Sequence, residues 1–336
     1  MKKIIFTCGD TNGIGPEVAV KTLQKLYDLR VKEQIIFISP VNVFIKYYHL
    51  TYSGFPFHVL DRTNLINSPE RIIIYGLPEV NMTVGKPTKQ SGKTAYLSLT
   101  ESYDLLKDEI ADAVVTAPVS KYALKLAGVD FPGQTEMFAS WCNEKNFMMT
   151  FLSSKMNAGL MTIHTPLKKV SSTITSKSVS RAIELISKTA KTDLGIKDPK
   201  IAVLGLNPHS GENGLIGNEE IKFIQPVLQN DKYSTFADGP FPADAFFAMR
   251  KYKDYDFVLG MYHDQVLIPF KLLNFNTGVN YTAGLPVVRT SPDHGSAFDI
   301  AGNNLADESS FYSAYLYAKK IVQNRKKNKS NKSTSI

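Results

Sequence analysis

The stretch IIFTCGDTNGIGPE, residues 4–17, decides the fold class. It begins with an apolar run suited to a buried strand and continues through a glycine-containing loop into a helix with Pro16 at its start. Such a strand–loop–helix passage is the beginning of a βαβ unit. The end of the strand and the start of the helix offer free backbone N–H groups to an anion. We therefore predict a ligand site at this loop, although glycines that only make a tight turn would give the same pattern.

The same alternation recurs along the chain. The predicted strands are residues 4–7, 35–38, 72–75, 113–116, 159–163, 201–206, 257–262 and 286–290. The predicted helices between them include residues 17–29, 94–107, 179–189 and 309–322. Strands alternating with helices of this length predict an α/β protein with a largely parallel sheet covered on both faces.

Two familiar nucleotide-binding motifs are excluded by single residues. A G-x-G-x-x-G fingerprint counted from Gly13 needs glycine at position 18, where Val18 stands. A P-loop ending at Gly92-Lys93-Thr94 needs glycine where Pro87 stands. The sequence is therefore neither a Rossmann fingerprint protein nor a P-loop nucleotide triphosphatase.

Net charge by itself would suggest a polyanionic partner, because 39 Lys and Arg residues stand against 31 Asp and Glu in 336 residues, a formal +8. Seven of the bases and none of the acids lie in residues 319–336, so the rest of the chain is close to neutral. Residues 323–336 are too polar to bury a core and are predicted to form a basic disordered tail. A nucleic-acid or membrane-surface role of this tail is the alternative. The main prediction is no nucleic-acid partner and no membrane partner.

Cysteine content and the lengths of apolar runs indicate in which cellular compartment the protein is expected. Only Cys8 and Cys142 occur, so no disulfide framework is indicated. The first apolar run stops at Gly9-Asp10, before the core of a signal peptide could form, and no run approaches the roughly 18 apolar residues of a membrane span. We predict a soluble, cytoplasmic protein.

Four of the six histidines occupy the same kind of position, just after an apolar run. They are His164, His209, His263 and His294. The carboxyl ends of strands line the ligand crevice of open α/β sheets, so several of these imidazoles should converge there. Three imidazoles without cysteine suit a catalytic divalent metal that keeps open positions. A single histidine of this kind is more often a hydrogen-bonded loop residue, and the residues alone leave a hydrolytic zinc site and a dehydrogenase metal site both open.

Eight motifs, in colinear order from about residue 4 to about residue 320, resemble the 4-hydroxythreonine-4-phosphate dehydrogenase family of vitamin B6 synthesis. They are GDTNGIGPE (9–17), VVTAPVSK (114–121), GQTEMFA (133–139), GLNPHSGENGLIGNEE (205–220), GPFPADAFF (239–247), GMYHDQVLIPFK (260–271), GVNY (278–281) and RTSPDHGSAFDIAG (289–302). The resemblance implies a homodimer with a shared active site and the isocitrate/isopropylmalate dehydrogenase-like fold. Each chain would form two α/β domains with the active-site cleft between them. Turn-rich stretches near residues 131–133 and after Asn280 place the first domain at residues 1–130 and 285–322, and the second, which carries the metal ligands, at 131–284.

The activity implied by the resemblance is oxidation of 4-phosphohydroxy-L-threonine at C3 with NAD or NADP. Decarboxylation to 3-amino-2-oxopropyl phosphate would follow, with one divalent ion (Zn, Mg, Co or Mn) as a second cofactor. The alternative is a related dehydrogenase acting on a phosphorylated four-carbon sugar acid or a dihydrodiol carboxylate. A metallohydrolase without nicotinamide is a further alternative.

The resemblance also assigns residues, motif by motif. The metal ligands would be His164, His209 and His263; the substrate ligands Gln134, Thr135, Lys271, Asn280 and Arg289; the cofactor loop Asp293, His294, Gly295 and Ala297; and the acid and base would come from Lys271, Asp244 and Asp264. One departure stands out, because the family motif usually has histidine where this chain has Gln134. Glutamine donates a hydrogen bond to phosphate, but it carries no charge and transfers no proton near neutral pH.

Overall fold

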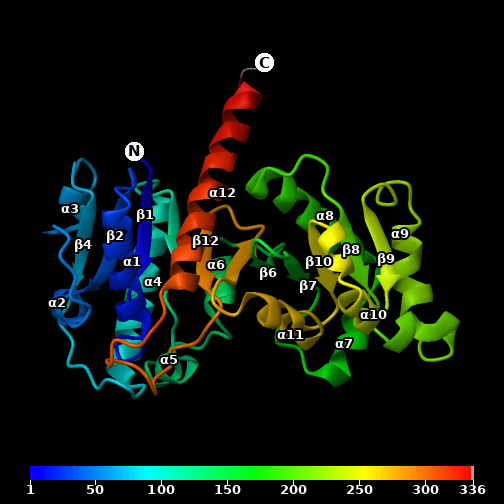
Figure 1. Cartoon of the computed structure of the whole chain (residues 1–336), viewed down its shortest axis with the longest axis horizontal. Coiled ribbons are helices and arrows are strands. Elements are labelled where there is room, and N and C mark those ends of the chain that lie inside the picture. The colour runs from blue at the N-terminus through cyan, green and yellow to red at the C-terminus, as the bar shows by residue number, and fades with distance from the viewer. Residues whose placement is uncertain (334–336) are drawn as a thin grey trace. The chain divides into compact units, whose positions relative to one another are not determined.

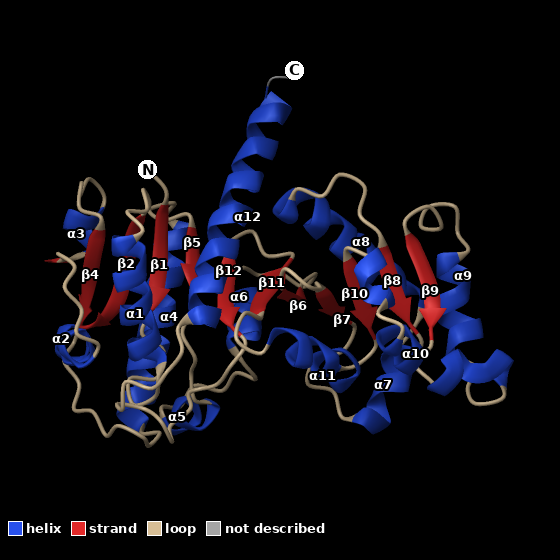
Figure 2. Cartoon of the chain, in the orientation of Figure 1, coloured by secondary structure: helices blue, strands red, loops and turns tan. Residues whose placement is uncertain are grey.

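The computed structural model describes residues 1–333, which divide into two compact units. Unit 1 consists of residues 1–143 and 286–322, and unit 2 of residues 144–285 together with residues 323–333. Each unit is a sheet flanked by helices, as the strands and helices of Figures 1 and 2 show. The α/β class is thus confirmed.

The sheet of unit 1 is entirely parallel, in the order β3-β4-β2-β1-β5-β12. Its strands are β1 (Lys3–Thr7), β2 (Gln34–Pro40), β3 (His58–Leu60), β4 (Ile72–Leu77), β5 (Ala113–Val115) and β12 (Arg289–Pro292). Its helices are α1 (Gly15–Asp28), α2 (Val41–Leu50), α3 (Arg62–Leu65), α4 (Lys89–Lys107), α5 (Lys121–Leu126), α6 (Gln134–Trp141) and the first part of α12 (Ser309–Ser333). The predicted strand at residues 4–7 and helix at 17–29 correspond to β1 and α1.

Local sequence explains why the central strands β1 and β2 and the helix α1 form. All seven residues of β2 and four of the five in β1 are buried, as expected for central strands covered on both faces. The α1 helix starts with Pro16, whose missing N–H costs nothing in the first turn, and it buries Val18, Leu23 and Leu26 on one side. The loop between β1 and α1 therefore lies at the carboxyl edge of a parallel sheet.

The sheet of unit 2 runs β11-β6-β7-β10-β8-β9. Its strands are β6 (Met148–Leu152), β7 (Ala158–Leu160), β8 (Ile201–Leu204), β9 (Ala237–Phe241), β10 (Phe257–Gly260) and β11 (Val279–Ala283). Strand β6 is antiparallel to β7 and β11, whereas β7, β10, β8 and β9 are parallel. The helices are α7 (Leu167–Thr173), α8 (Ser176–Thr189), α9 (Gln225–Leu228), α10 (Ala243–Ala248) and α11 (His263–Asn274), with short helical turns at Ala190–Leu194, Pro208–Gly214, Glu220–Ile224 and Lys251–Asp254.

The boundary of the first unit differs from the predicted one. Unit 1 runs to Asn143 instead of ending at residue 130, so it includes α6 and with it Gln134 and Thr135. Aromatic packing explains the difference, because Phe138 and Trp141 of α6 contact Tyr103 of α4. The turn-rich stretch at residues 131–133 is thus a loop inside unit 1.

The predicted disorder of residues 323–336 is wrong for the part of the tail that the structure describes. Helix α12 continues to Ser333, and residues 334–336 lie outside the described residues. Polar contacts within unit 2 hold this extension: Arg325 pairs with Asp193, and Asn324 and Asn328 donate to the carbonyl oxygens of Asp193 and Thr192. Among residues 1–333, no helix has both the length and the apolar composition to cross a bilayer.

Candidate active site

Arg289 is the centre of a polar cluster in unit 1, beside the carboxyl end of β5. It begins β12 and is 3% exposed. Its Nε donates to Thr116 Oγ1 at 3.0 Å and its Nη2 to Gln134 Oε1 at 3.1 Å, while Nη1 lies 3.4 Å from Thr135 Oγ1. Burial lowers the pKa of the guanidinium to about 10, although the Glu136 carboxylate acts in the opposite direction. Arg289 therefore keeps its charge at neutral pH and suits a phosphate or carboxylate group.

Gln134 and Thr135 stand beside this arginine because α6 begins there. The Gln134 amide bridges two groups: its Nε2 donates to the carbonyl oxygen of Ala117 at 3.0 Å, and its Oε1 accepts from Arg289. Three of the five predicted substrate ligands are thus brought together within unit 1. The sequence did not indicate Thr116, whose hydroxyl fixes the guanidinium from the end of β5.

The loop after β1 packs against the loop after β12. The Ile14 N–H donates to the Ser296 carbonyl oxygen at 2.9 Å, and a Cβ on Gly13 would meet that oxygen at 2.7 Å, which explains a glycine there. Asp10 is fully buried and accepts from the Asn12 N–H at 3.0 Å; burial raises the pKa of its carboxyl. Within the described residues, Asp10 Oδ2, Thr11 Oγ1 and Ser296 Oγ have no hydrogen-bond partner. These three oxygens fit a site for a polar ligand beside the predicted cofactor loop.

The predicted cofactor residues form the turn that follows β12. The Asp293 N–H donates to Ser310 Oγ at 3.1 Å, and His294 Nδ1 lies 3.1 Å from the Gly295 carbonyl oxygen. Ala297 has a φ of 38°, in the left-handed region that residues other than glycine rarely adopt. The loop is therefore built with local backbone strain next to the buried oxygens described above.

In unit 2, three histidines follow three neighbouring parallel strands. His164 follows β7, His209 follows β8 and His263 follows β10, and β10 lies between β7 and β8. Their strand ends therefore share one edge, as the sequence predicted. Nevertheless, no three His, Cys, Asp or Glu side chains in residues 1–333 lie close enough together to hold a metal ion. As placed, the three imidazoles do not form a coordination site.

A cavity of about 420 Å³ opens beside these strand ends. Among its lining residues are His209, Asp244, Tyr262 and Asp264. His263 is close to this wall in sequence, and its Nδ1 lies 2.7 Å from Asp264 Oδ1. Two predicted acid–base residues and one predicted metal ligand thus line one cavity. Lys271, exposed on α11, and Asn280, half-buried in β11, are not among its lining residues.

The loop that carries His209 is held in an unusual conformation. His209, Ser210, Glu212 and Asn213 all have φ between 43° and 53°. Buried Glu220 anchors its start, because Glu220 Oε1 accepts from the Asn207 N–H at 2.7 Å and Oε2 from Asn207 Nδ2 at 2.9 Å. A strained loop that Glu220 anchors therefore fixes the surroundings of the His209 imidazole.

Gln265 lines the same cavity, and the sequence did not indicate it. Its Oε1 accepts from the Met261 N–H at 2.7 Å and its Nε2 donates to the Gly205 carbonyl oxygen at 2.7 Å. The side chain thus joins the chain after β10 to the chain after β8, and so joins the segments that carry His263 and His209. The signal that could have found it is its place in the GMYHDQ motif, two residues after His263.

The two units define the class of fold, in which each unit is an α/β sheet flanked by helices. An isocitrate dehydrogenase structure from Methylococcus capsulatus matches with a TM-score of 0.50 at 12% identity, covering 97% of this chain and 87% of that one, which shows a shared fold. The model of the family described as "Pyridoxal phosphate biosynthetic protein PdxA" matches residues 31–318. The chain belongs to this family.

Relatives at higher sequence identity support the same family assignment. The 4-hydroxythreonine-4-phosphate dehydrogenase of Bacteroides thetaiotaomicron is 36% identical, covering 97% of this chain and 90% of that protein. The crystal structure of the enzyme of the same name from Klebsiella pneumoniae has a TM-score of 0.81 at 32% identity, with 96% and 100% covered. A terephthalate 1,2-cis-dihydrodiol dehydrogenase from Burkholderia xenovorans matches with a TM-score of 0.64 at 25% identity, with 95% and 98% covered.

Proposed function

We propose that this protein is an NAD- or NADP-dependent 4-hydroxythreonine-4-phosphate dehydrogenase of pyridoxal phosphate synthesis. The observation that carries the proposal is the buried Arg289 cluster, in which Thr116 and Gln134 orient a charged guanidinium beside the carboxyl end of β5. Membership of the family and the names of its relatives supply the reaction class. Arg289, Gln134 and Thr135 bind the phosphate or carboxylate of the substrate, and the loop at residues 293–297 belongs to the nicotinamide cofactor.

Oxidation at C3 of 4-phosphohydroxy-L-threonine makes a β-keto acid, which loses carbon dioxide to give 3-amino-2-oxopropyl phosphate. A base must take the C3 hydroxyl proton, and an acid must return a proton to carbon after decarboxylation. Asp244 and Asp264 are the proposed residues on the cavity in unit 2, with Lys271 as the third. Asp264 Oδ1 lies 2.7 Å from His263 Nδ1, so this carboxylate contacts a proposed metal ligand.

His164, His209 and His263 are the proposed ligands of one divalent ion. Their position at adjacent parallel strand ends and their neutral nitrogen donors support this assignment. A divalent ion would supply positive charge to the substrate oxygen atoms. The side chains as placed do not meet around one point, so binding requires a shift of at least one imidazole. Calorimetric titration with Zn²⁺ tests the assignment directly, since His263→Ala should abolish the binding heat while His49→Ala should leave it unchanged.

The proposed assembly is a homodimer with a shared active site. Helix α11 supports it: Ile268, Leu272 and Phe275 follow the spacing of one helix face, continued one residue past its end, and are 60%, 82% and 86% exposed. An apolar stripe of this kind on a folded unit is typical of a buried interface. Lys271 lies on the same helix, so a partner on this face would also come close to Lys271.

The test of the activity is formation of NADH or NADPH from 4-phosphohydroxy-L-threonine, with and without a chelator. We expect turnover in metal-replete protein and loss of turnover after chelation. Absence of turnover in metal-replete protein with either cofactor would refute the proposal. Metal-dependent activity without any change in nicotinamide absorbance would instead indicate a hydrolase.

A second candidate function is favoured by one residue. Gln134 replaces the histidine usual in the family motif, and a dihydrodiol dehydrogenase is among the similar solved structures. Ratios of kcat/KM for 4-phosphohydroxy-L-threonine, a phosphorylated four-carbon sugar acid and a dihydrodiol carboxylate discriminate these substrates. A preference for either of the last two would replace the leading proposal.

A further inference from the structure

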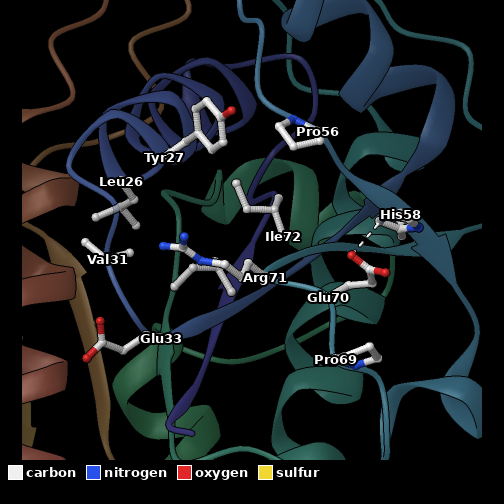
Figure 3. A pocket seen from close by; sticks show the side chains of 11 residues that line it. Leu26, Tyr27, Val31, Glu33, Pro56, His58, Pro69, Glu70, Arg71 and Ile72 are labelled. Carbon is white, nitrogen blue, oxygen red and sulfur yellow. Dashed lines mark ion pairs between the residues drawn. The ribbon is translucent and has the colours of Figure 1, made fainter.

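A second cavity of about 300 Å³ lies in unit 1, and none of its lining residues belongs to the candidate active site (Figure 3). Ile35 and Ile72 on its floor stand near the amino ends of β2 and β4. These strands are parallel to β1, so the cavity lies at the sheet edge opposite to the one that carries the loop after β1. A ligand here would not be the substrate of the proposed reaction.

The walls of this cavity are largely apolar. Leu26 and Ile35 are each 1% exposed, and Val31, Pro56 and Ile72 complete the apolar surface. The Tyr27 ring, 41% exposed, stands at the rim. The volume is at the low end of the roughly 300–1,000 Å³ found for small-molecule sites. It is about twice the ~150 Å³ engineered cavity that holds benzene.

The charged groups of the cavity leave one cation available. Glu33 accepts from Tyr315 at 3.0 Å and from Lys319 at 3.1 Å, and Glu70 pairs with His58 at 3.0 Å. Burial would raise the pKa of the Glu33 carboxyl, but the bonds from Lys319 and Tyr315 outweigh it and hold that pKa below its ordinary value. Arg71 is exposed; its guanidinium lies among the labelled residues of Figure 3 and makes no ion pair or hydrogen bond with any residue in the described part of the chain.

We propose that this cavity binds a small aromatic anion, with the ring against the apolar lining at Val31, Pro56 and Ile72 and the anionic group on Arg71. The apolar walls favour a flat hydrophobic body over a hydrated one. Since both carboxylates already have cationic or hydrogen-bonding partners, Arg71 is the group whose charge a ligand can complement, and its planar fork fits a phosphate or carboxylate. The proposed substrate has no ring and does not match these walls.

The test uses a local fluorescent reporter. Trp141 is the single tryptophan of the chain, so Tyr27→Trp adds a second indole at the rim, and the parent protein serves as the blank. The probe is phenyl phosphate, with inorganic phosphate and phenol as half-probes. We expect a saturable fluorescence change with a Kd below about 1 mM for phenyl phosphate, and much weaker responses to either half-probe.

Two further variants on the reporter background separate the contributions. Arg71→Gln should weaken binding about tenfold or more, whereas Arg30→Gln, the same change on an exposed arginine nearby that does not line the cavity, should have little effect. Val31→Phe keeps all charges and fills the space, and it should abolish binding. Circular dichroism confirms folding of each variant. Equal affinity of the Arg71→Gln protein, or an equal response to inorganic phosphate alone, would overturn the proposal.

Discussion

At the scale of single residues, Arg289 combines full burial with charge. A buried cation is costly unless neighbours satisfy its donors, and Thr116 and Gln134 do so from β5 and α6. That arrangement holds the guanidinium in one orientation before substrate arrives, which reduces the entropy lost on binding an anion.

Arg289→Lys should therefore weaken substrate binding although it keeps the charge. A lysine ammonium cannot replace both the Nε bond to Thr116 and the Nη2 bond to Gln134, so we expect KM for 4-phosphohydroxy-L-threonine to rise about 10- to 100-fold with a smaller change in kcat. Steady-state kinetics measures this, with Arg250→Lys as the exposed control. Because burial lowers the pKa of Arg289 to about 10, wild-type affinity should also fall as pH rises through about 10, where the charge is lost. An unchanged KM in the lysine variant would contradict the role.

Gln134→His tests the departure from the family motif. A histidine next to Arg289 would have its pKa held below the ordinary value of about 6.5, because the nearby cation disfavours a second positive charge. We expect the variant to gain turnover of 4-phosphohydroxy-L-threonine and to acquire an additional ionisation below about 6.5 in its kcat/KM profile. The control is Gln134→Asn, which stays neutral and should add no ionisation. Identical pH profiles for wild type and Gln134→His would show that this position does not act on the reaction.

At the scale of elements, the C-terminal part of α12 is held by a polar triad in which half-buried Arg325 reaches two buried side chains. Arg325 Nε donates to Asp193 Oδ1 at 2.7 Å and Nη2 to Tyr281 Oη at 2.9 Å, and the Tyr281 hydroxyl donates to Asp193 Oδ2 at 2.6 Å. Asp193 is 3% exposed and Tyr281 fully buried. Tyr281 follows Asn280 in β11, so the triad also fixes the strand that carries a proposed substrate ligand.

Removal of the arginine should be far more damaging than removal of another base of the tail. Arg325→Met leaves the Asp193 carboxylate buried without its cation, which costs about 3–5 kcal/mol for a buried pair broken on one side. We expect a lower midpoint of urea unfolding and a lower Tm, whereas the exposed Lys327→Ala should change neither measurably. Adding Asp193→Asn to Arg325→Met should recover part of the loss. Equal stability of the Arg325 and Lys327 variants would mean that the triad contributes nothing.

At the scale of the whole molecule, the exposed stripe of α11 predicts association. Leu272→Glu places a charge in the centre of the stripe formed by Ile268, Leu272 and Phe275 and should dissociate the proposed dimer. Sedimentation velocity at a fixed protein concentration measures the change, and activity should fall with it because the proposed site is shared. Met249→Glu, on an equally apolar and 70% exposed side chain outside the stripe, should leave the assembly intact. A monomeric wild-type protein with full activity would refute the shared site.

Local patterning predicted most of the fold and part of the site. The α/β class and the strand-end positions of His164, His209 and His263 follow from apolar runs of consecutive residues. A parallel strand that is buried on both faces needs such a continuous apolar run, so the sequence shows where it ends. The pairing of Arg289 with Gln134 was only implied by resemblance, since hydrogen bonds between residues 155 apart in the chain leave no local pattern.

What the sequence by itself determined is thus the class of fold, the edge of each sheet where polar residues gather, and the family. Only the tertiary structure decided that α6 belongs to the first unit, that Gln265 joins two loops, and that α12 continues to Ser333. The tail shows the physical reason most clearly. Its composition is that of a disordered segment, yet Arg325 pairs with Asp193, 132 residues away in the chain. No local pattern in the sequence shows that Asp193 is buried. Local composition measures what a segment can bury by itself, whereas order in this tail comes from what the rest of unit 2 presents to it.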